Sequence, residues 1–158
     1  MSESLRYTKN ADKKDKYEKI LPQVSYLLVN ETDIIANMAN ICAILKEVFD
    51  FFWVGFYIVK GKDLVLGPFQ GPLACTRIPY GKGVCGTAWK NRKTIIVEDV
   101  NAFEGHIACS SLSQSEIVVP LIIKNEVVAV LDVDSKQLHT FDSIDKEYLE
   151  KTLSHLHL

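Results

Sequence analysis

Apolar residues recur every three or four positions in three stretches of this chain, which is the spacing of an amphipathic helix. The first stretch runs from about Lys14 to Leu28. Pro22 lies inside it and predicts a kink or a restart near Leu21, because proline cannot donate the backbone hydrogen bond that a helix interior needs. The last stretch begins at Asp142, whose side chain can cap a helix.

The middle stretch predicts a second helix, beginning just after residue 30. Asn30 or Thr32 can cap it, and Asp33 suits its first turn, where the helix dipole favours an acidic side chain. Cys42 falls on the apolar stripe of this helix. Because free cysteine is among the most buried residue types, we expect Cys42 to lie in the core.

Between the second and the last helix the pattern changes to that of strands and turns. Residues 51–59 are rich in aromatic and β-branched side chains, and residues 60–62 turn this strand into a returning one at 63–66. The further elements that we expect are a loop at 67–72, a short edge strand at 77–80, a short helix at 84–90, a strand at 94–97, a loop at 99–115, and a hairpin of strands at 117–123 and 127–133, with Pro120 near an edge or bulge.

Hairpins outnumber parallel crossovers in this order of elements. We therefore predict an α+β fold with a central antiparallel sheet, the terminal helices on one face, and the short helix and loops over the other. The chain has 158 residues, enough for one domain with a real core. We expect that domain at residues 13–158, after a polar and poorly ordered N-terminus at residues 1–12.

Composition narrows the classes of function. Hydrophobic residues make up 47% of the chain, which argues against disorder, and a net charge of −2 gives no reason to expect a nucleic-acid partner. The apolar runs are too short to span a bilayer, and the first residues lack the pattern of a secretion signal. We expect a cytoplasmic protein without a membrane partner, whose four cysteines are free, metal-bound or catalytic rather than structural disulfides.

Three of the four cysteines lie in small, turn-prone or polar surroundings. They are Cys75, Cys85 and Cys109, and this setting can favour a reactive thiolate, whereas Cys42 lies on an apolar stripe. Cys85 falls in the first turn of the expected short helix, where backbone N–H groups lower the pKa of a thiol. Local electrostatics alone therefore favours Cys85 as the nucleophile.

Acidic residues form the next candidate group. Asp132 and Asp134 alternate along an otherwise apolar strand, so their side chains share one face, and Glu116 directly precedes the expected strand at 117–123. Acids that cluster in a pocket raise one another's pKa, so that one can stay protonated near neutral pH. The alternative is that Asp134 begins a turn and that Glu116 is a solvated loop residue.

Two aromatic residues, Trp53 and Tyr57, lie four apart on the first expected strand and hence share a face. An aromatic residue on a strand most often belongs to the core of the sheet, and this is the simplest interpretation of both residues.

Several of these motifs together resemble one known family. The motifs are residues 53–57, 67–71, 74–75, 81–86, 106–109, 115–120 and 131–135. They resemble the free methionine-R-sulfoxide reductases, enzymes with a GAF fold. The resemblance implies reduction of free methionine-R-sulfoxide to methionine as a response to oxidative stress, without a cofactor. It also implies that Cys109 is the nucleophile, that Cys75 resolves it by forming a disulfide, and that Cys85 is a secondary or alternative resolving residue.

The resemblance further implies a substrate pocket and partners. Trp53, Tyr57, Glu116, Asp132 and Asp134 would line the pocket, thioredoxin would reduce the disulfide, and the protein would form a homodimer. A non-catalytic GAF sensor is one alternative. A structural zinc site is another, and its ligands would be His106, Cys109, Cys75 and Cys85, although no Cys-x-x-Cys pair accompanies them.

Overall fold

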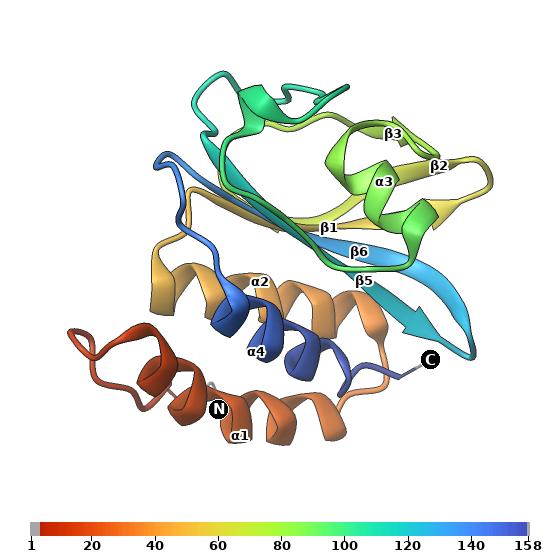
Figure 1. Cartoon of the computed structure of the whole chain (residues 1–158). Helices are drawn as coiled ribbons and strands as arrows, with labels where there is room; N and C mark the ends of the chain where they lie inside the picture. The colour runs from red at the N-terminus through yellow and green to blue at the C-terminus, as the bar shows by residue number, and fades with distance from the viewer. Residues whose placement is uncertain (1–3, 158) are drawn as a thin grey trace.

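A computed structural model describes residues 4–157, and a six-stranded antiparallel sheet lies at its centre (Figure 1). The strand order is β3-β2-β1-β6-β5-β4. The helices are α1 (Lys13–Val29), α2 (Ile34–Phe49), α3 (Gly83–Asn91), α4 (Ser143–Leu153) and a short 3-10 helix, η1 (Val100–Ala102). The strands are β1 (Trp53–Lys60), β2 (Asp63–Gln70), β3 (Arg77–Pro79), β4 (Ile95–Val97), β5 (Ser115–Ile123) and β6 (Glu126–Ser135). This architecture confirms the predicted α+β fold.

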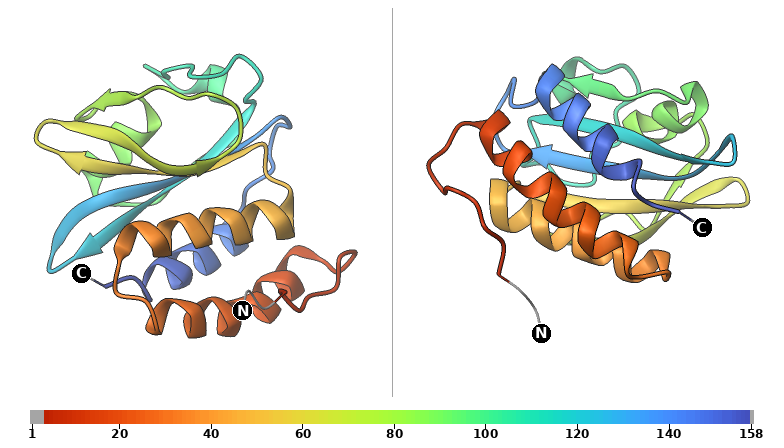
Figure 2. Two further views of the ribbon diagram at one scale, coloured as in Figure 1. Left: turned by 180° about the vertical axis from the view of Figure 1, so that it is seen from behind. Right: turned by 90° about the horizontal axis from the view of Figure 1, so that it is seen from below.

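The two faces of the sheet carry different layers. Helices α2 and α4 pack on one face, and α1 lies across them on the side away from the sheet (Figures 1 and 2). Helix α3 and the loop before β5 cover the other face. Along β1, Val54 and Phe56 point into the core beneath the helices, whereas Trp53 and Tyr57 point to the α3 side, as the two-residue period of a strand requires.

Helix α1 runs without interruption from Lys13 to Val29 and contains Pro22, so the predicted restart is wrong. Ile20 and Val24, on either side of the proline, are buried in the same core. Tertiary packing of this apolar face supplies most of a helix's stability, and here it outweighs the hydrogen bond that proline removes.

Two other local predictions need correction. Asp33, not Asn30 or Thr32, is the N-cap of α2, because its carboxylate accepts hydrogen bonds from the backbone N–H groups of residues 35 and 36. Strand β2 continues through the predicted loop as far as Gln70. It does so across an irregularity where residues 67 and 68 face the single residue Phe56, which is a bulge that accommodates Pro68.

The N-terminal segment before α1 contacts the helices. The backbone N–H and carbonyl of Arg6 both bond to the side chain of Gln23, and the Tyr7 hydroxyl donates to the carbonyl of Glu47. Residues 1–3, on which part of the expected disorder falls, lie outside the described residues. Within residues 4–157, no helix has the length and apolar character needed to span a membrane.

The prediction for Cys42 is confirmed. Its side chain is buried in the core between α2 and the sheet, and its thiol donates to the carbonyl of Pro68 at 3.3 Å. Burial raises the pKa of this thiol to about 12.

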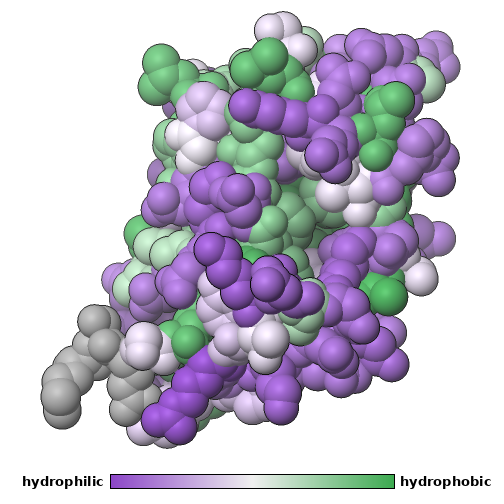
Figure 3. Space-filling model, turned by 90° about the vertical axis from the view of Figure 1, so that its left-hand side faces the viewer, coloured by the Kyte–Doolittle hydropathy of each residue, from purple (hydrophilic) through white to green (hydrophobic). Residues whose placement is uncertain are grey.

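Most of the side of the molecule shown in Figure 3 is hydrophilic, with isolated hydrophobic residues and a hydrophobic hollow between them.

Candidate functional site

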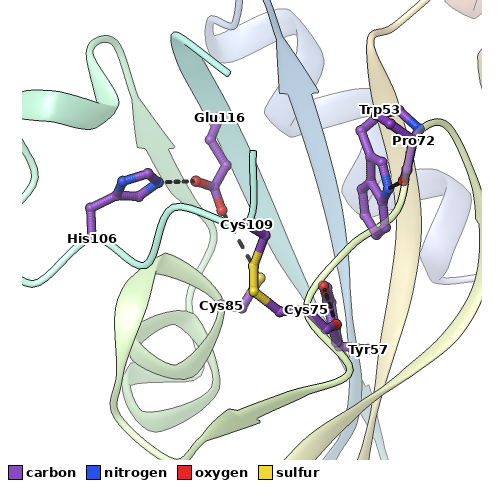
Figure 4. The surroundings of a disulfide bond; sticks show 8 residues. All are labelled: Trp53, Tyr57, Pro72, Cys75, Cys85, His106, Cys109 and Glu116. Atoms are coloured by element: carbon purple, nitrogen blue, oxygen red, sulfur yellow. Dashed lines mark hydrogen bonds and ion pairs between the residues drawn. A yellow bond between two sulfur atoms is a disulfide. The ribbon is translucent and has the colours of Figure 1, made fainter. Parts of the chain in front are cut away.

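A pocket lies on the α3 side of the sheet, and it brings the predicted site residues together (Figure 4). Strands β1, β5 and β6 form its floor, the first turn of α3 forms one wall, and the loops after β2 and before β5 close it. The predicted residues that line it are Trp53, Tyr57, Cys85, Cys109, Glu116, Asp132 and Asp134. Cys75, the remaining one, is covalently bonded to Cys109.

A disulfide joins Cys75 and Cys109 at the edge of this pocket. The two cysteines come from different loops, 34 residues apart in the chain, and their Cα atoms lie 5.3 Å apart. Both are half-buried. Because these two sulfur atoms are bonded to each other, the zinc site considered above is not formed, and Cys42 and Cys85 are the cysteines left as free thiols.

Cys85 lies in the first turn of α3, as expected, but its pKa is raised rather than lowered. The largest cause is complete burial, and the nearby carboxyl groups of Asp132 and Glu116 act in the same direction. The Sγ atom lies 4.0 Å from Oε1 of Glu116. Burial and acidic neighbours therefore outweigh the helix N-terminus, and the electrostatic argument for Cys85 as the nucleophile is wrong.

The register of the sheet places the three acids side by side. Glu116 on β5 pairs with Asp134 on β6, and Asp134 pairs on its other side with Trp53 of β1. Asp132 lies two residues before Asp134 on the same face and pairs with Gly55. Glu116 and Asp132 are buried and Asp134 is half-buried, so Glu116 is not a solvated loop residue.

This cluster favours neutral carboxyl groups. Burial, the largest cause, raises the pKa of Glu116, Asp132 and Asp134 well above the usual range, and each carboxyl group also raises the pKa of a neighbour. Among the described residues, Oδ1 of Asp132 is a buried oxygen without a hydrogen-bond partner. Buried polar atoms are normally paired, so this oxygen is available to a ligand.

The same cluster has the composition of a cation site. One ligand atom each from Cys85, Glu116 and Asp132 lies within 4.8 Å of the others. A thiolate and carboxylates are ligands that zinc accepts, so these are the residues that could hold such an ion. Binding would require their protons to leave, because burial raises the pKa of all three groups.

Trp53 packs closely against two glycines, of which Gly55 was not singled out from the sequence. A Cβ atom at Gly55 would lie 2.5 Å from Cβ of Phe69 and closer still to the indole of Trp53, and one at Gly71 would lie 2.6 Å from the same ring. The indole N–H donates to the carbonyl of Pro72 at 3.1 Å. A glycine inside a strand often marks such a close approach, and this was the available signal.

Tyr57 connects the pocket wall to the cysteine loop. Its hydroxyl donates to the backbone carbonyl of Cys75 at 3.0 Å, and its ring stacks on Trp53 with 5.9 Å between ring centres. Both rings are buried and both line the pocket. The two aromatic residues therefore belong to the buried core on this side of the sheet and also line the pocket.

His106 is a further pocket residue, which the sequence analysis considered only as a zinc ligand. Its Nε2 atom lies 3.7 Å from Oε2 of Glu116, and burial lowers its pKa (Figure 4). The imidazole is therefore largely neutral at neutral pH. Its position three residues before Cys109 was the signal in the sequence.

Comparison with known proteins identifies the family of this chain. The family model for the GAF domain matches residues 31–157. Free methionine-R-sulfoxide reductase of Escherichia coli (strain K12) is 43% identical over 146 residues, which cover 92% of this chain and 88% of that protein. The protein of the same name from Saccharomyces cerevisiae is 38% identical, and the match covers 95% of this chain and 88% of that protein.

A solved structure is similar over almost the whole chain. The X-ray structure of free methionine-R-sulfoxide reductase from Neisseria meningitidis, in complex with its substrate, has a TM-score of 0.93 and 51% sequence identity. The match covers 96% of this chain and 92% of that one. With these identities over nearly full length, the chain belongs to the free methionine-R-sulfoxide reductases, a family built on the GAF domain.

Proposed function

We propose that this protein reduces free methionine-R-sulfoxide to methionine, with Cys109 as the nucleophile and Cys75 as the resolving thiol. The observation that carries the proposal is the disulfide between these residues at the edge of a pocket with an aromatic wall and an acidic floor. The relatives that bear this name, one of them solved with its substrate, support the same activity.

In the first step the Cys109 thiolate attacks the sulfoxide sulfur, and the oxygen is transferred to the cysteine. Methionine leaves and Cys109 becomes a sulfenic acid. The oxygen needs a proton, and one of the buried carboxyl groups can supply it, because burial raises the pKa of these groups and so favours the protonated form. Asp132 is well suited to hold the sulfoxide oxygen, because its Oδ1 has no other partner among the described residues.

In the second step Cys75 attacks the sulfenic acid. Its thiol proton and the hydroxyl group leave as water, and the disulfide of this structure forms. Tyr57 supports this step by holding the carbonyl of Cys75. Thioredoxin then reduces the disulfide, and Cys85 is a secondary thiol. The Cys85 thiol is buried, its Sγ atom lies 4.0 Å from Oε1 of Glu116, and its pKa is raised, so it suits a secondary resolving thiol better than the first nucleophile.

The pocket also suits a free amino acid. The methyl group of the sulfoxide packs against Trp53, and an ionised carboxylate of the acidic floor binds the ammonium group. A residue within a peptide chain has no such ammonium group. The R configuration is selected because Cys109 approaches the chiral sulfur from one fixed direction.

The test is a coupled assay with thioredoxin, thioredoxin reductase and NADPH. We expect NADPH to be consumed with free methionine-R-sulfoxide but not with the S form or with peptide-bound R sulfoxide. The Cys109→Ser variant should lose all turnover. The Cys75→Ser variant should release about one methionine per chain and then stop, because its sulfenic acid is not resolved efficiently.

Two outcomes would overturn the assignment. If folded, reduced protein turned over none of the sulfoxides, the ligand-binding GAF module would become the leading function. If Cys85→Ser, rather than Cys109→Ser, abolished the first methionine release, the roles of the cysteines would have to be exchanged.

The whole site comes from one domain, which we assign to residues 13–158, and it needs a compartment in which a disulfide can be reduced. We propose the cytoplasm for this reason.

We also propose a homodimer. Tyr26, Leu27, Val29 and Ile35 expose apolar side chains where α1 ends and α2 begins, and burying them would favour association. Sedimentation of Val29→Glu beside the wild type tests this, with a monomeric wild type as the contrary result.

A further inference from the structure

Exposed apolar side chains lie on both sides of the disulfide. Leu73, two residues before Cys75, is 90% exposed, and Leu112, three residues after Cys109, is 55% exposed. Ile107, two residues before Cys109, is 37% exposed and lines the pocket together with Leu73. We call Leu73, Ile107 and Leu112 the apolar rim.

The apolar rim contributes little to the fold that the structure describes. None of its three side chains belongs to either hydrophobic cluster of the described residues. A single exposed leucine needs no explanation, but several large apolar side chains around one reactive group mark a surface that contacts another molecule. The Cα atoms of the bonded cysteines are only 5.3 Å apart, so the two loops that carry the rim meet at the disulfide.

We propose that the apolar rim is the docking surface for a protein dithiol, and that the reductant recognises the oxidised protein through it. The inference rests on the proposed function, because each turnover leaves Cys75 and Cys109 as a disulfide that must be reopened. Both cysteines are only half-buried, so an attacking thiolate can reach the pair from outside. The partner would carry an uncharged, apolar surface around its own reactive cysteine, which the rim would cover.

The exchange is balanced in electrons and protons. A thiolate of the partner attacks one sulfur of the pair, the bond between Cys75 and Cys109 breaks, and the released thiolate takes a proton from solvent. The second thiolate of the partner attacks the mixed disulfide and releases the other cysteine, which is protonated in turn. The partner is oxidised to its disulfide and this protein is reduced to two thiols.

The test measures reduction of the disulfide directly, without any sulfoxide, so that it does not depend on the proposed activity. Oxidised protein is mixed with reduced thioredoxin or with dithiothreitol, stopped with an alkylating reagent, and analysed for free thiols over time. The variants are Leu73→Gln and Leu112→Gln, alone and combined. Glutamine has nearly the volume of leucine and adds no charge, so it does not repel the attacking thiolate. Ile122→Gln is the matched control, because Ile122 is 43% exposed near the opposite end of β5 from Glu116.

We expect the double variant to be reduced by thioredoxin about five- to tenfold more slowly than the wild type, a loss of roughly 1–1.4 kcal/mol of binding free energy in the encounter. Dithiothreitol should reduce the wild type and the variants within about twofold of one another, and Ile122→Gln should match the wild type with both reductants.

Three results would overturn the inference. In the first, thioredoxin reduces the double variant as fast as the wild type. In the second, the rates with thioredoxin and dithiothreitol fall together, which would mean that the rim shapes the disulfide itself. In the third, thioredoxin fails to reduce the wild type although dithiothreitol succeeds, which would assign the task to a small thiol. If all reductions proceed as expected but no sulfoxide is turned over in the coupled assay, the proposed function fails and the docking surface stands.

Discussion

Glu116 and Asp134 face each other directly across β5 and β6, on the pocket side of the sheet. Two carboxyl groups in this position would repel each other if both were ionised, and water is largely excluded from them. The pair therefore tends to retain at least one proton. Asp132 lies on the same face of β6, and burial raises the pKa of its carboxyl group as it does for Glu116 and Asp134. A site that retains protons in this way suits the reduction proposed above, in which the sulfoxide oxygen needs a proton.

The buried carboxyl groups should make the fold less stable as the pH rises. Their pKa is raised by folding, so the native protein holds protons that the unfolded chain has released. The stabilisation is fully present below the unfolded pKa, near 4, and is lost as the pH rises through the native pKa. Urea unfolding of oxidised protein between about pH 5 and pH 8 should show this loss, at most about 1.4 kcal/mol per pH unit for each carboxyl group.

Comparison with Asp132→Asn isolates the effect of one carboxyl group. The amide cannot ionise, so the variant should gain stability relative to the wild type as the pH rises, while losing activity. The contribution of His106 has the opposite sign, because its pKa is lowered, but it largely cancels in this difference. A difference between the two proteins that does not change with pH would contradict the argument.

The free thiols of the oxidised protein should be unreactive. Cys42 and Cys85 are both buried, and burial raises the pKa of both thiols, that of Cys42 to about 12. We expect a thiol reagent such as DTNB to find almost no thiol in the native oxidised protein at neutral pH, and about two per chain after unfolding in urea. Rapid native labelling of one thiol that disappears in Cys85→Ser would show that Cys85 is accessible and activated.

The hydrophobic pattern predicted the helices, the hairpins and the antiparallel sheet, because burial of one face imposes a period that is visible along the chain. It failed at Pro22, at the cap of α2 and at the bulge that carries β2 past Pro68. In each case the outcome depends on what the segment packs against or which neighbouring groups it bonds, and a local pattern does not contain that information.

The site shows the same limit. That Asp132 and Asp134 share a face follows from strand periodicity, but their contact with Glu116 requires the register of β5 and β6. The position of Cys85 in the first turn of a helix predicted a lowered pKa, whereas burial and the acids of strands β5 and β6 raise it. The pairing of Cys75 with Cys109 came from resemblance to a family, because spacing alone does not determine which cysteines meet.

The buried carboxylate of Asp145 should be important for stability rather than for activity. It accepts hydrogen bonds from the Tyr17 hydroxyl at 2.9 Å and from the Lys13 ammonium at 2.5 Å, and so fastens α1 to the start of α4. Tyr17→Phe should lower the free energy of unfolding by about 1–2 kcal/mol, because it leaves Oδ1 of Asp145 without its partner. Lys13→Met should lower it by about 2–3 kcal/mol, because it removes the cation from Oδ2 of Asp145, which then keeps only the hydrogen bond from the backbone N–H of Asp142.

The matched control is Lys14→Met. Lys14 forms an exposed ion pair with Glu18 at 3.8 Å, and such pairs contribute at most about 1 kcal/mol, so urea unfolding should show little change. The activity of all three variants should stay within about twofold of the wild type below their unfolding transitions, because none of the residues lines the pocket. If Lys13→Met and Lys14→Met lowered the free energy of unfolding equally, the hydrogen bonds to Asp145 would contribute no more to stability than an exposed ion pair.

Gly55 should be as important for the reaction as the residues that touch the substrate. It lies beneath the indole of Trp53, and a methyl group there would come within 2.5 Å of Phe69 and closer to the ring. Gly55→Ala should therefore displace Trp53, lower kcat/KM by at least about tenfold, and cost about 1–3 kcal/mol of stability from overpacking.

Gly61→Ala separates the packing effect from the general cost of replacing a glycine. Gly61 lies in the turn between β1 and β2 with nothing within 4 Å of a Cβ atom, although its φ of +63° carries a backbone penalty of about 1 kcal/mol. Its kcat/KM should therefore stay close to that of the wild type while its stability falls slightly. Equal kcat/KM values for Gly55→Ala and the wild type would mean that the indole can move without harm, and Trp53 would then be a core residue rather than the wall that receives the substrate methyl group.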